Sequence, residues 1–327
     1  CACPVLSQVL DNGPNNRRFP FSHLRYYPYN KKNMANEKLM KGHIVDFALQ
    51  MKKLVNNKDH SDIKFLIGSN RKPVFAHRCI LSARCAVFKA MFAEQSQKNA
   101  AEKDVPFVLS DMYPEIFLSM LEFIYTNCVT LTPKIAIDVM SASLEYGLDE
   151  LRKLCADYLI DNLSVQNACD CMQAAVTYSQ EDLKDHTLRY IEEHTENVFK
   201  SKGFQELSED SLCEVLRSDE LNMDEAEIIA YIKEWATVNA VVISKSVSDV
   251  AKKAVMNVRL PLLMPEEIEK LEKDNKRDNL VPVDCFNAAW RFHAIKQADP
   301  NNPLQRLRKG TKPRDCHKYL NSTQQTN

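Results

Sequence analysis

Strand-like patterns are confined to one part of this chain, and that restriction limits its fold more than any other feature. "SDIKFLIG" has the branched and aromatic residues of a strand and ends at Gly68, "KPVFAH" follows as a returning strand, and "DVPFVLSDM" is a third short strand. From Ser164 onward the strand signals vanish and the segments show helical periodicity. The sequence therefore predicts a mixed α/β domain followed by an all-α domain.

Helical patterns surround the three strands. Residues 44–55 form an amphipathic pattern whose apolar face consists of Ile44, Phe47, Met51 and Leu54. Residues 114–125 form a second helical pattern. A third opens with Thr132 as N-cap and Pro133 at the first helical position, and Gly147 is its expected end. "LDELRKLCADYLIDNL" follows as a further short helix.

The segment "VFAHRCILSARCAVFKAMF", residues 74–92, places a histidine and two cysteines among apolar residues, which raises the question of a reactive or metal-binding site. Cys79 and Cys85 are expected to behave as small apolar side chains, and His77 as a structural histidine. Spacing alone leaves a Cys–His nucleophile open, but no oxyanion-donor loop accompanies it. Two adjacent apolar stripes predict a mostly buried helix instead: Ile80, Ala83, Val87 and Met91, and beside them Leu81, Cys85, Phe88 and Phe92.

The chain has only six glycines, and no two of them lie close together. Loops that hold phosphate need clustered glycines so that backbone N–H groups can approach the anion. Neither a Walker loop nor a dinucleotide-binding fingerprint can be written here, which excludes most nucleotide-dependent enzymes. No set of general acid, base and nucleophile emerges either, so we expect no enzyme, no catalytic residue and no cofactor.

Eleven cysteines are scattered along the chain without a disulfide framework. Cys1-x-Cys3 and Cys169-x-Cys171 lack the spacing and the histidine partners of a zinc site, and cysteines two apart point in different directions on a helix. We therefore expect reduced, metal-free thiols and a cytoplasmic protein, with the nucleus as the alternative compartment. No apolar run approaches about 20 residues, so no membrane span is expected.

Charge is distributed unevenly, although the formal total is only −1. Residues 1–33 carry a net +4 and residues 303–327 a net +5, which leaves −10 for residues 34–302. An acidic body is a poor partner for nucleic acid, whose binding depends on phosphate neutralisation. The ends are expected to be solvated: residues 1–42 as a disordered extension, with Met34 as a candidate natural start, and residues 296–327 as a basic, mostly disordered tail.

The second domain is expected to consist of helices alone. Asn222-x-x-Glu225 has the form of a capping box at the start of one of them. Trp235 falls on the apolar face of that helix, so we expect it to anchor the core. The helical segments are "SVQNACDCMQAAVTYS", "EDLKDHTLRYIEEHTENVF", "SEDSLCEVLRS", "NMDEAEIIAYIKEWATVNA" and "MPEEIEKLEKD".

Motifs in residues 43–163 resemble a BTB/POZ domain: the Asp of "SDI", the "FAH" strand-to-helix transition, the "EFIYT" helix and the closing "YGLDEL". The phrases "GFQELSEDSLCEVLRSDEL", "DEAEIIAYIKEWA" and "VRLPLLMPEEI" are similar to a BACK domain, over residues 164–295. The resemblance implies an α+β BTB/POZ domain, with short strands capped by helices, followed by an all-α BACK domain. It also implies a protein-interaction module that often forms homodimers.

By resemblance, Asp62 and Arg78 match the charged pair of the BTB dimer pocket, and residues 44–55 match the first, dimer-forming helix. A partly buried pair of this type leaves a costly unpaired charge if one partner is removed. The apolar stripe of the helix is consistent with an interface between two identical chains. Packing of that stripe against its own domain is the alternative.

Many BTB–BACK proteins hold cullin-3 and present a client for ubiquitylation. The resemblance implies a cullin-facing surface made of the loop after Phe92, the end of the helix at Tyr125 and the start of the helix at Pro133. Family members often carry a hydrophobic-x-Glu motif in that loop. The nearest candidate here is Ala100-x-Glu102, in which alanine offers little apolar area for docking.

Two functions therefore stay open at this stage. The first is a homodimeric adaptor that links a client protein to a cullin-3 ubiquitin ligase, with residues 165–178 as a supplementary cullin contact. The second is a dimeric scaffold with no ligase link. Both are non-catalytic, and neither involves nucleic acid or a membrane.

Overall fold

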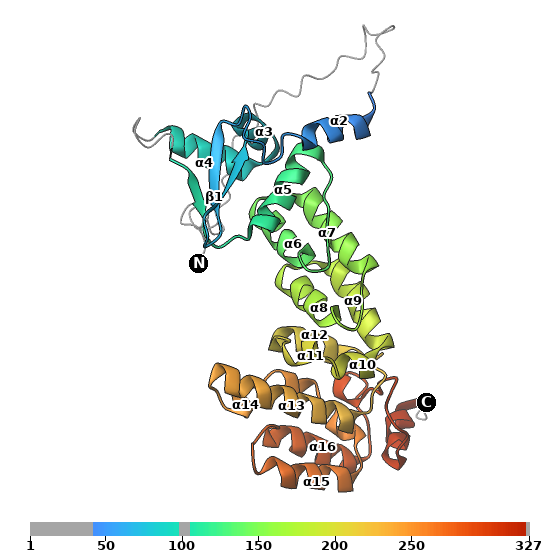
Figure 1. Ribbon diagram of the computed structural model, residues 1–327. Coiled ribbons are helices and arrows are strands. Elements are labelled where there is room, and N and C mark those ends of the chain that lie inside the picture. The colour runs from blue at the N-terminus through green and yellow to red at the C-terminus, as the bar shows by residue number, and fades with distance from the viewer. Residues whose placement is uncertain (1–41, 98–104, 325–327) are drawn as a thin grey trace. The chain divides into compact units, whose positions relative to one another are not determined.

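The computed structural model describes residues 42–97 and 105–324 (Figure 1). The chain divides into two compact units, of which the first ends at Cys155 and the second begins at Ala156. This division falls inside one helix, α7 (Asp149–Asp161). Residues 1–41, which hold Met34 and nearly all of the predicted N-terminal extension, lie outside the described residues.

The first unit combines a small sheet with helices, as the predicted α+β class requires. Its three strands have the order β2-β1-β3, and β1 pairs antiparallel with β2 and parallel with β3. In chain order the elements are α2 (Ile44–Lys52), β1 (Ile63–Ile67), β2 (Lys72–Ala76), α3 (Arg78–Arg84), α4 (Ala86–Ser96), β3 (Phe107–Leu109), α5 (Pro114–Thr126), α6 (Ala136–Glu145) and α7.

Aromatic rings form the centre of the first unit. Phe65 lies in the middle of β1 and is fully buried, because alternate residues of a strand face the same side. Its ring centroid lies 5.0 Å from that of Phe117 on α5 and 5.7 Å from that of Phe88 on α4. Phe65 of the central strand thus packs against both α4 and α5.

Residues 74–92 form a strand end and two helices, whereas the sequence predicted one continuous helix after the strand. Cys85 has extended backbone angles (φ −138°, ψ 118°) and separates α3 from α4. Each predicted stripe contains residues of both helices. The stripe of Leu81, Cys85, Phe88 and Phe92 is buried, whereas Ala83 of the other stripe is exposed. Cys85 is buried as predicted, but Cys79 is exposed, and its expected role as a buried apolar side chain is wrong.

The helix predicted to open at Thr132 begins later. Thr132 and Pro133 precede it in a turn, in which the Thr132 carbonyl accepts the N–H groups of Ile135 and Ala136, both at 3.1 Å. Its end is as predicted. Gly147 has a positive φ of 64°, a conformation that glycine adopts without strain, and it follows directly after the last turn.

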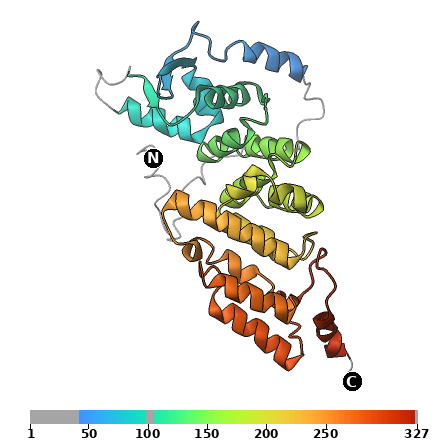
Figure 2. The same ribbon diagram turned by 60° about the horizontal axis from the view of Figure 1, so that its bottom comes forward.

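Every described element of the second unit is a helix, as the sequence predicted. Figures 1 and 2 both show α15 and α16 side by side and α13 as a long helix near them. The elements are α8 (Ala168–Thr177), α9 (Glu181–Glu193), α10 (Thr195–Phe199), α11 (Lys202–Gln205), α12 (Glu209–Arg217), α13 (Glu225–Ile243), α14 (Val247–Val250), α15 (Pro265–Asn275), α16 (Val283–Ile295), and the 3-10 helices η2 (Ala254–Asn257), η3 (Leu260–Leu262), η4 (Pro303–Gln305) and η5 (Asp315–Gln324).

The long helix α13 confirms one prediction and corrects another. Trp235 is 2% exposed, and its indole Nε1 donates to the Leu207 carbonyl at 2.9 Å, so it anchors the core as expected. The capping box Asn222-x-x-Glu225 is wrong. Asp224 is the N-cap and accepts the N–H of Ala226, while Glu225 turns into the interior, where it pairs with the buried Arg308 and accepts the backbone N–H of Arg259.

The C-terminal segment differs most from its prediction. Residues 296–327 were expected to be mostly disordered, but the described part forms η4 and η5, and the side chain of Arg308 is 0% exposed. Arg314 is likewise nearly buried, at 7%. Charge in this segment does not lead to solvation, because both arginines meet carboxylates of the same unit.

Candidate protein-interaction surfaces

The helix α2 exposes its apolar residues. None of its residues is buried, and Ile44, Val45, Phe47 and Leu49 are 55–74% exposed. Of the predicted apolar face, Met51 and Leu54 are half-buried, and Leu54 lies just beyond the end of the helix. A soluble chain rarely leaves several large apolar residues together in water, so this surface is a candidate interface.

The helix α2 is attached to the first unit at its C-terminal end. Figure 1 shows it next to the end of α5, and Lys52 forms an ion pair of 2.5 Å with Glu122 of that helix. Asp46 in the first turn and Lys52 in the last complement the helix dipole. The N-terminal part of α2 is therefore a formed helix whose apolar side chains have no cover from their own unit.

Asp62 and Arg78 are brought together, but not as a simple ion pair. The Asp62 carboxylate accepts the backbone N–H of Arg78 at 2.7 Å, at the first turn of α3. The N-cap residue His77 makes no side-chain cap, so Asp62 supplies it from the residue before β1. The Arg78 Nη2 group donates to Gln95 Oε1 at 2.6 Å, and its guanidinium carbon lies 4.8 Å from the centroid of the Phe92 ring.

Gln95 is a residue that the sequence interpretation missed. Its side chain is buried on α4 and joins Arg78 to the Val105 carbonyl, to which Nε2 donates at 2.8 Å. The only signal was a polar residue on an otherwise apolar helix face. Together these contacts hold the Arg78 side chain against the first unit.

Asp62 and Arg78 line the same open pocket. Its volume is about 340 Å³, and Asp62 is exposed while Arg78 is half-buried. Positively charged side chains outnumber the single carboxylate at this pocket. Its lining consists of Lys58, Ser61, Asp62, Ile63, Lys64, Phe75, Arg78, Val105 and Pro106.

Two of the five residues predicted for the cullin-facing surface are buried. Phe92 is 7% exposed and Tyr125 is 4% exposed, so neither ring is offered to a partner in this structure, and Tyr125 as a surface contact is wrong. Pro133 is exposed in the turn before α6, as expected. Ala100 and Glu102 lie outside the described residues.

The Tyr125 hydroxyl serves the interior of the first unit. It accepts the backbone N–H of His77 at 2.8 Å and lies 3.0 Å from His77 Nδ1. Burial raises the pKa of Tyr125 to about 12. Tyr125 thus fixes the strand-to-helix transition at His77, and His77 has the structural role predicted for it.

The buried thiols have the chemistry of core residues. Burial raises the pKa of Cys85, and it raises the pKa of Cys169 to about 11 and that of Cys171 to about 12. A thiol with a raised pKa is a weak nucleophile because little thiolate is present near neutral pH. Within residues 42–97 and 105–324, no group of three or more His, Cys, Asp or Glu side chains is placed to hold a metal ion.

No helix among the described residues is both long and apolar enough to cross a bilayer. The longest, α13, spans Glu225–Ile243 and has two acidic residues in its first turn. The candidate surfaces of the first unit are the α2 face, the pocket at Asp62 and the turn at Pro133.

This fold has known counterparts. The family model for the BTB/POZ domain matches residues 51–163, and that for the BACK domain, "BTB And C-terminal Kelch", matches residues 168–273. The chain belongs to the BTB/POZ family and carries a BACK domain after the BTB/POZ domain. Proteins of this family are typically non-catalytic adaptors for protein interactions.

Particular relatives agree with this assignment. The chain is 38% identical over 281 residues to BTB/POZ domain-containing protein 19 of Bos taurus, which covers 85% of this chain and 95% of that protein. The Homo sapiens protein of the same name is also 38% identical, over 84% of this chain and 94% of its own length. BTB/POZ domain-containing protein 9 of Homo sapiens is 28% identical over 66% of this chain and 34% of its own. Among solved structures, the BTB domain of zebrafish PATZ1 covers 37% of this chain at 17% identity, with a TM-score of 0.29.

Proposed function

We propose that this chain is a homodimeric, non-catalytic adaptor whose two copies associate through α2 and the neighbouring surface of the BTB/POZ domain. The observation that carries the proposal is the exposed apolar face of α2. The helix has charges that complement its dipole at both ends, but the side chains of Ile44, Val45, Phe47 and Leu49 are exposed to water. Burying one such side chain contributes roughly 1.5–3 kcal/mol. A second copy presents the same face, so an interface with two-fold symmetry covers both.

The dimer is tested with two matched variants of the full-length chain. Phe47→Asp puts a charge into the apolar face, whereas Gln50→Asp puts the same charge on an exposed polar position of the same helix. Sedimentation equilibrium is expected to show a dimer for the unmodified chain and for Gln50→Asp, and an at least tenfold weaker dimer for Phe47→Asp. A monomer at all micromolar concentrations of the unmodified chain would contradict the proposal.

We further propose that a dimer of this kind presents clients to a ligase through cullin-3, and the first unit limits where cullin-3 can bind. Because Phe92 and Tyr125 are buried, the candidate contact residues among those that the structure describes are the exposed positions before α6, such as Pro133 and Lys134. The scaffold without a ligase link is the second candidate, and burial of the two aromatic rings favours it.

Titration of the full-length chain with the N-terminal domain of cullin-3 separates the two candidates. Saturable binding that weakens in Lys134→Glu but not in the exposed control Lys72→Glu supports the adaptor. An interface worth roughly 6–7 kcal/mol registers at tens of micromolar. If no binding appears at that concentration, the scaffold is the function and the ligase link is withdrawn.

A further inference from the structure

The C-terminal segment Arg306–His317 lies against an acidic part of the second unit. The BACK match ends at residue 273, so this segment lies beyond the matched region. It contributes two arginines that are almost fully buried, together with a glycine and two lysines between them. The surface that receives it consists of the α12–α13 connection, the start of α13, the end of η2 and the start of α15.

Arg308 enters the deepest part of this surface. Its Nε donates to Glu225 Oε2 at 3.0 Å, and both side chains are 0% exposed. Nη1 donates to the carbonyls of Leu216 and Ser218, and Nη2 donates to the carbonyl of Asn257 at 3.0 Å. The guanidinium thus donates to one carboxylate and three backbone carbonyls, so each of its three nitrogens has an acceptor.

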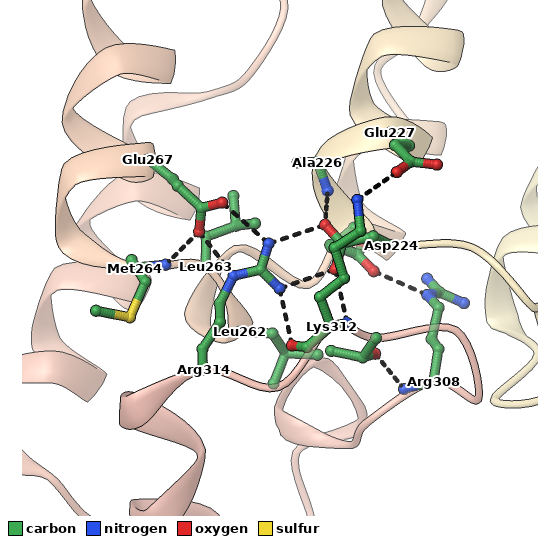
Figure 3. A network of polar contacts seen from close by, with 12 residues as sticks. Asp224, Ala226, Glu227, Leu262, Leu263, Met264, Glu267, Arg308, Lys312 and Arg314 are labelled. Atoms are coloured by element: carbon green, nitrogen blue, oxygen red, sulfur yellow. Dashed lines mark hydrogen bonds and ion pairs between the residues drawn. The ribbon is translucent and has the colours of Figure 1, made fainter.

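Arg314 lies between two carboxylates, as Figure 3 shows. It binds Asp224 through two parallel bonds of 2.8 Å, and its Nε donates to Glu267 Oε2 at 2.7 Å. Paired bonds of this geometry suit the planar guanidinium and cannot be made by lysine. Lys312 adds a backbone N–H to Asp224 at 2.9 Å and an ion pair of 2.6 Å with Glu227.

The backbone between the two arginines forms a turn that is held by hydrogen bonds to the α12–α13 connection. The N–H groups of Lys309 and Gly310 donate to the carbonyls of Asp219 and Leu221 at 2.8 and 3.0 Å. A Cβ at Gly310 would lie 2.0 Å from the backbone nitrogen of Met223, which cannot yield as a flexible side chain does. Only glycine fits at this position.

The connection to the rest of the chain is mostly exposed. α16 ends at Ile295, and its C-cap Lys296 has a positive φ of 60°. Ala298 is buried, whereas Gln297, Asp299, Pro300 and Asn301 are exposed. The only apolar side chain of the segment that is fully buried is Cys316, while Leu307 is 48% exposed. Recognition of the segment therefore rests on arginine, glycine and backbone contacts rather than on an apolar core.

We propose that this acidic surface is a peptide-binding site for the pattern Arg-x-Gly-x-Lys-x-Arg, and that the chain's own residues 308–314 occupy it as an internal ligand. Charge complementarity selects the two arginines, and the backbone of Met223 selects the glycine between them. A peptide with the same pattern, supplied in trans, competes with the internal segment for the site.

The test cuts the folded, full-length protein at a protease recognition sequence inserted between Pro300 and Asn301. Gel filtration is expected to show that the released C-terminal fragment stays with the body, and a labelled synthetic peptide of residues 303–320 exchanges into the site. Peptides with Arg308→Ala, Gly310→Ala or Arg314→Ala bind at least tenfold more weakly. The Lys309→Ala peptide is the matched control and binds like the parent, because the Lys309 side chain is exposed.

Three outcomes would overturn the proposal. The fragment elutes alone from a body that keeps its helical circular dichroism, or it stays bound but never exchanges with the peptide, or the cut protein unfolds at once. The last two would make residues 303–317 a fixed part of the domain rather than a ligand. Equal binding of the parent and the three variant peptides would also exclude the recognition described here.

Discussion

The helix α2 and the C-terminal segment Arg306–His317 lie near the two ends of the described chain and have opposite relations to water. The first is apolar and has no buried residue, whereas the second is basic and buries two arginines. From hydropathy alone, α2 would be expected to be buried and the basic C-terminal segment to be exposed. The difference teaches that burial follows from available partners: the arginines find carboxylates in their own unit, whereas the apolar face of α2 finds no cover there.

Loss of Arg308 is expected to have the largest effect on stability. Arg308→Met leaves the Glu225 carboxylate buried with no cation at its Oε2 atom, and breaking a buried pair in this way costs about 3–5 kcal/mol. Chemical denaturation measures the change in the free energy of unfolding. Lys309→Met removes a neighbouring exposed charge and serves as the control. If Arg308→Met and Lys309→Met lowered the free energy of unfolding equally, the contrast between the C-terminal segment and α2 would fail, because burial of Arg308 would then add nothing to stability.

The ion pairs of Asp224 predict how the second unit responds to acid. Burial raises the pKa of Asp224, but the hydrogen bonds from Arg314, Lys312 and Ala226 outweigh it and lower the pKa from 3.8 to about 2. The ionised carboxylate therefore contributes stability above pH 4, and this contribution is lost as the pH falls toward 2. It amounts to roughly 2 kcal/mol.

The measurement compares the unfolding free energy of the unmodified chain and Asp224→Asn between pH 2 and pH 6. Asparagine keeps a side-chain oxygen at the N-cap of α13, so the variant removes mainly the charge. The difference is expected to be full above pH 4 and to vanish near pH 2. Asp185→Asn, at an exposed position of α9, is the matched control, and a difference for Asp224→Asn that grows on acidification would contradict the assignment.

A smaller effect is expected for the contact that attaches α2 to its own unit. Lys52→Met removes the ion pair with Glu122, in which the lysine is more than half exposed. Exposed pairs of this kind are worth up to about 1 kcal/mol. Thermal denaturation of this variant, beside the control Lys53→Met at the C-cap of the same helix, measures the loss of stability. If Lys52→Met lowered the free energy of unfolding as much as Arg308→Met, α2 would be an integral part of the first unit rather than a helix attached at one end.

The smallest effect concerns the folded monomer with a changed α2 face. Because Phe47 is 62% exposed, Phe47→Ser is expected to alter the free energy of unfolding by less than about 0.5 kcal/mol at nanomolar concentration, where the proposed dimer is dissociated. At high concentration only the unmodified chain gains stability, since dimer formation favours the folded state. Denaturation midpoints at two concentrations test this, and a concentration-independent midpoint for both would argue against a dimer.

Local patterns in the sequence were enough for the elements and the family. The alternation in β1, the helical stripes of α5 and α13, and the glycine that ends α6 all lie within a few residues of one another. Each reports the backbone geometry of its own segment. Asp62 was identified through the resemblance, and the structure placed its carboxylate 2.7 Å from the Arg78 nitrogen.

Tertiary packing decided what local patterns do not contain. Tyr125 and Leu49 both stand in helical segments, yet the first is 4% exposed and the second 55%, because a core lies beside α5 and none covers α2. Cys79 and Cys85 likewise differ in burial: Cys79 is exposed and Cys85 is buried. The sequence pattern did not show this difference, because it did not show that the extended backbone of Cys85 separates α3 from α4. Periodicity shows that a face is apolar, but not whether that face meets its own domain or another molecule.

The sequence by itself determined a mixed α/β domain followed by a helical domain, because periods of two and 3.6 residues are properties of neighbouring side chains. The BTB/POZ and BACK assignment came from the resemblance of its motifs. The sequence did not determine the fate of the basic C-terminal segment. Arg308 and Glu225 are 83 positions apart, and Arg314 and Asp224 are 90 apart. Pairing over such distances depends on which surfaces the folded helices bring together, and only the tertiary structure made these charges neighbours in a space without water.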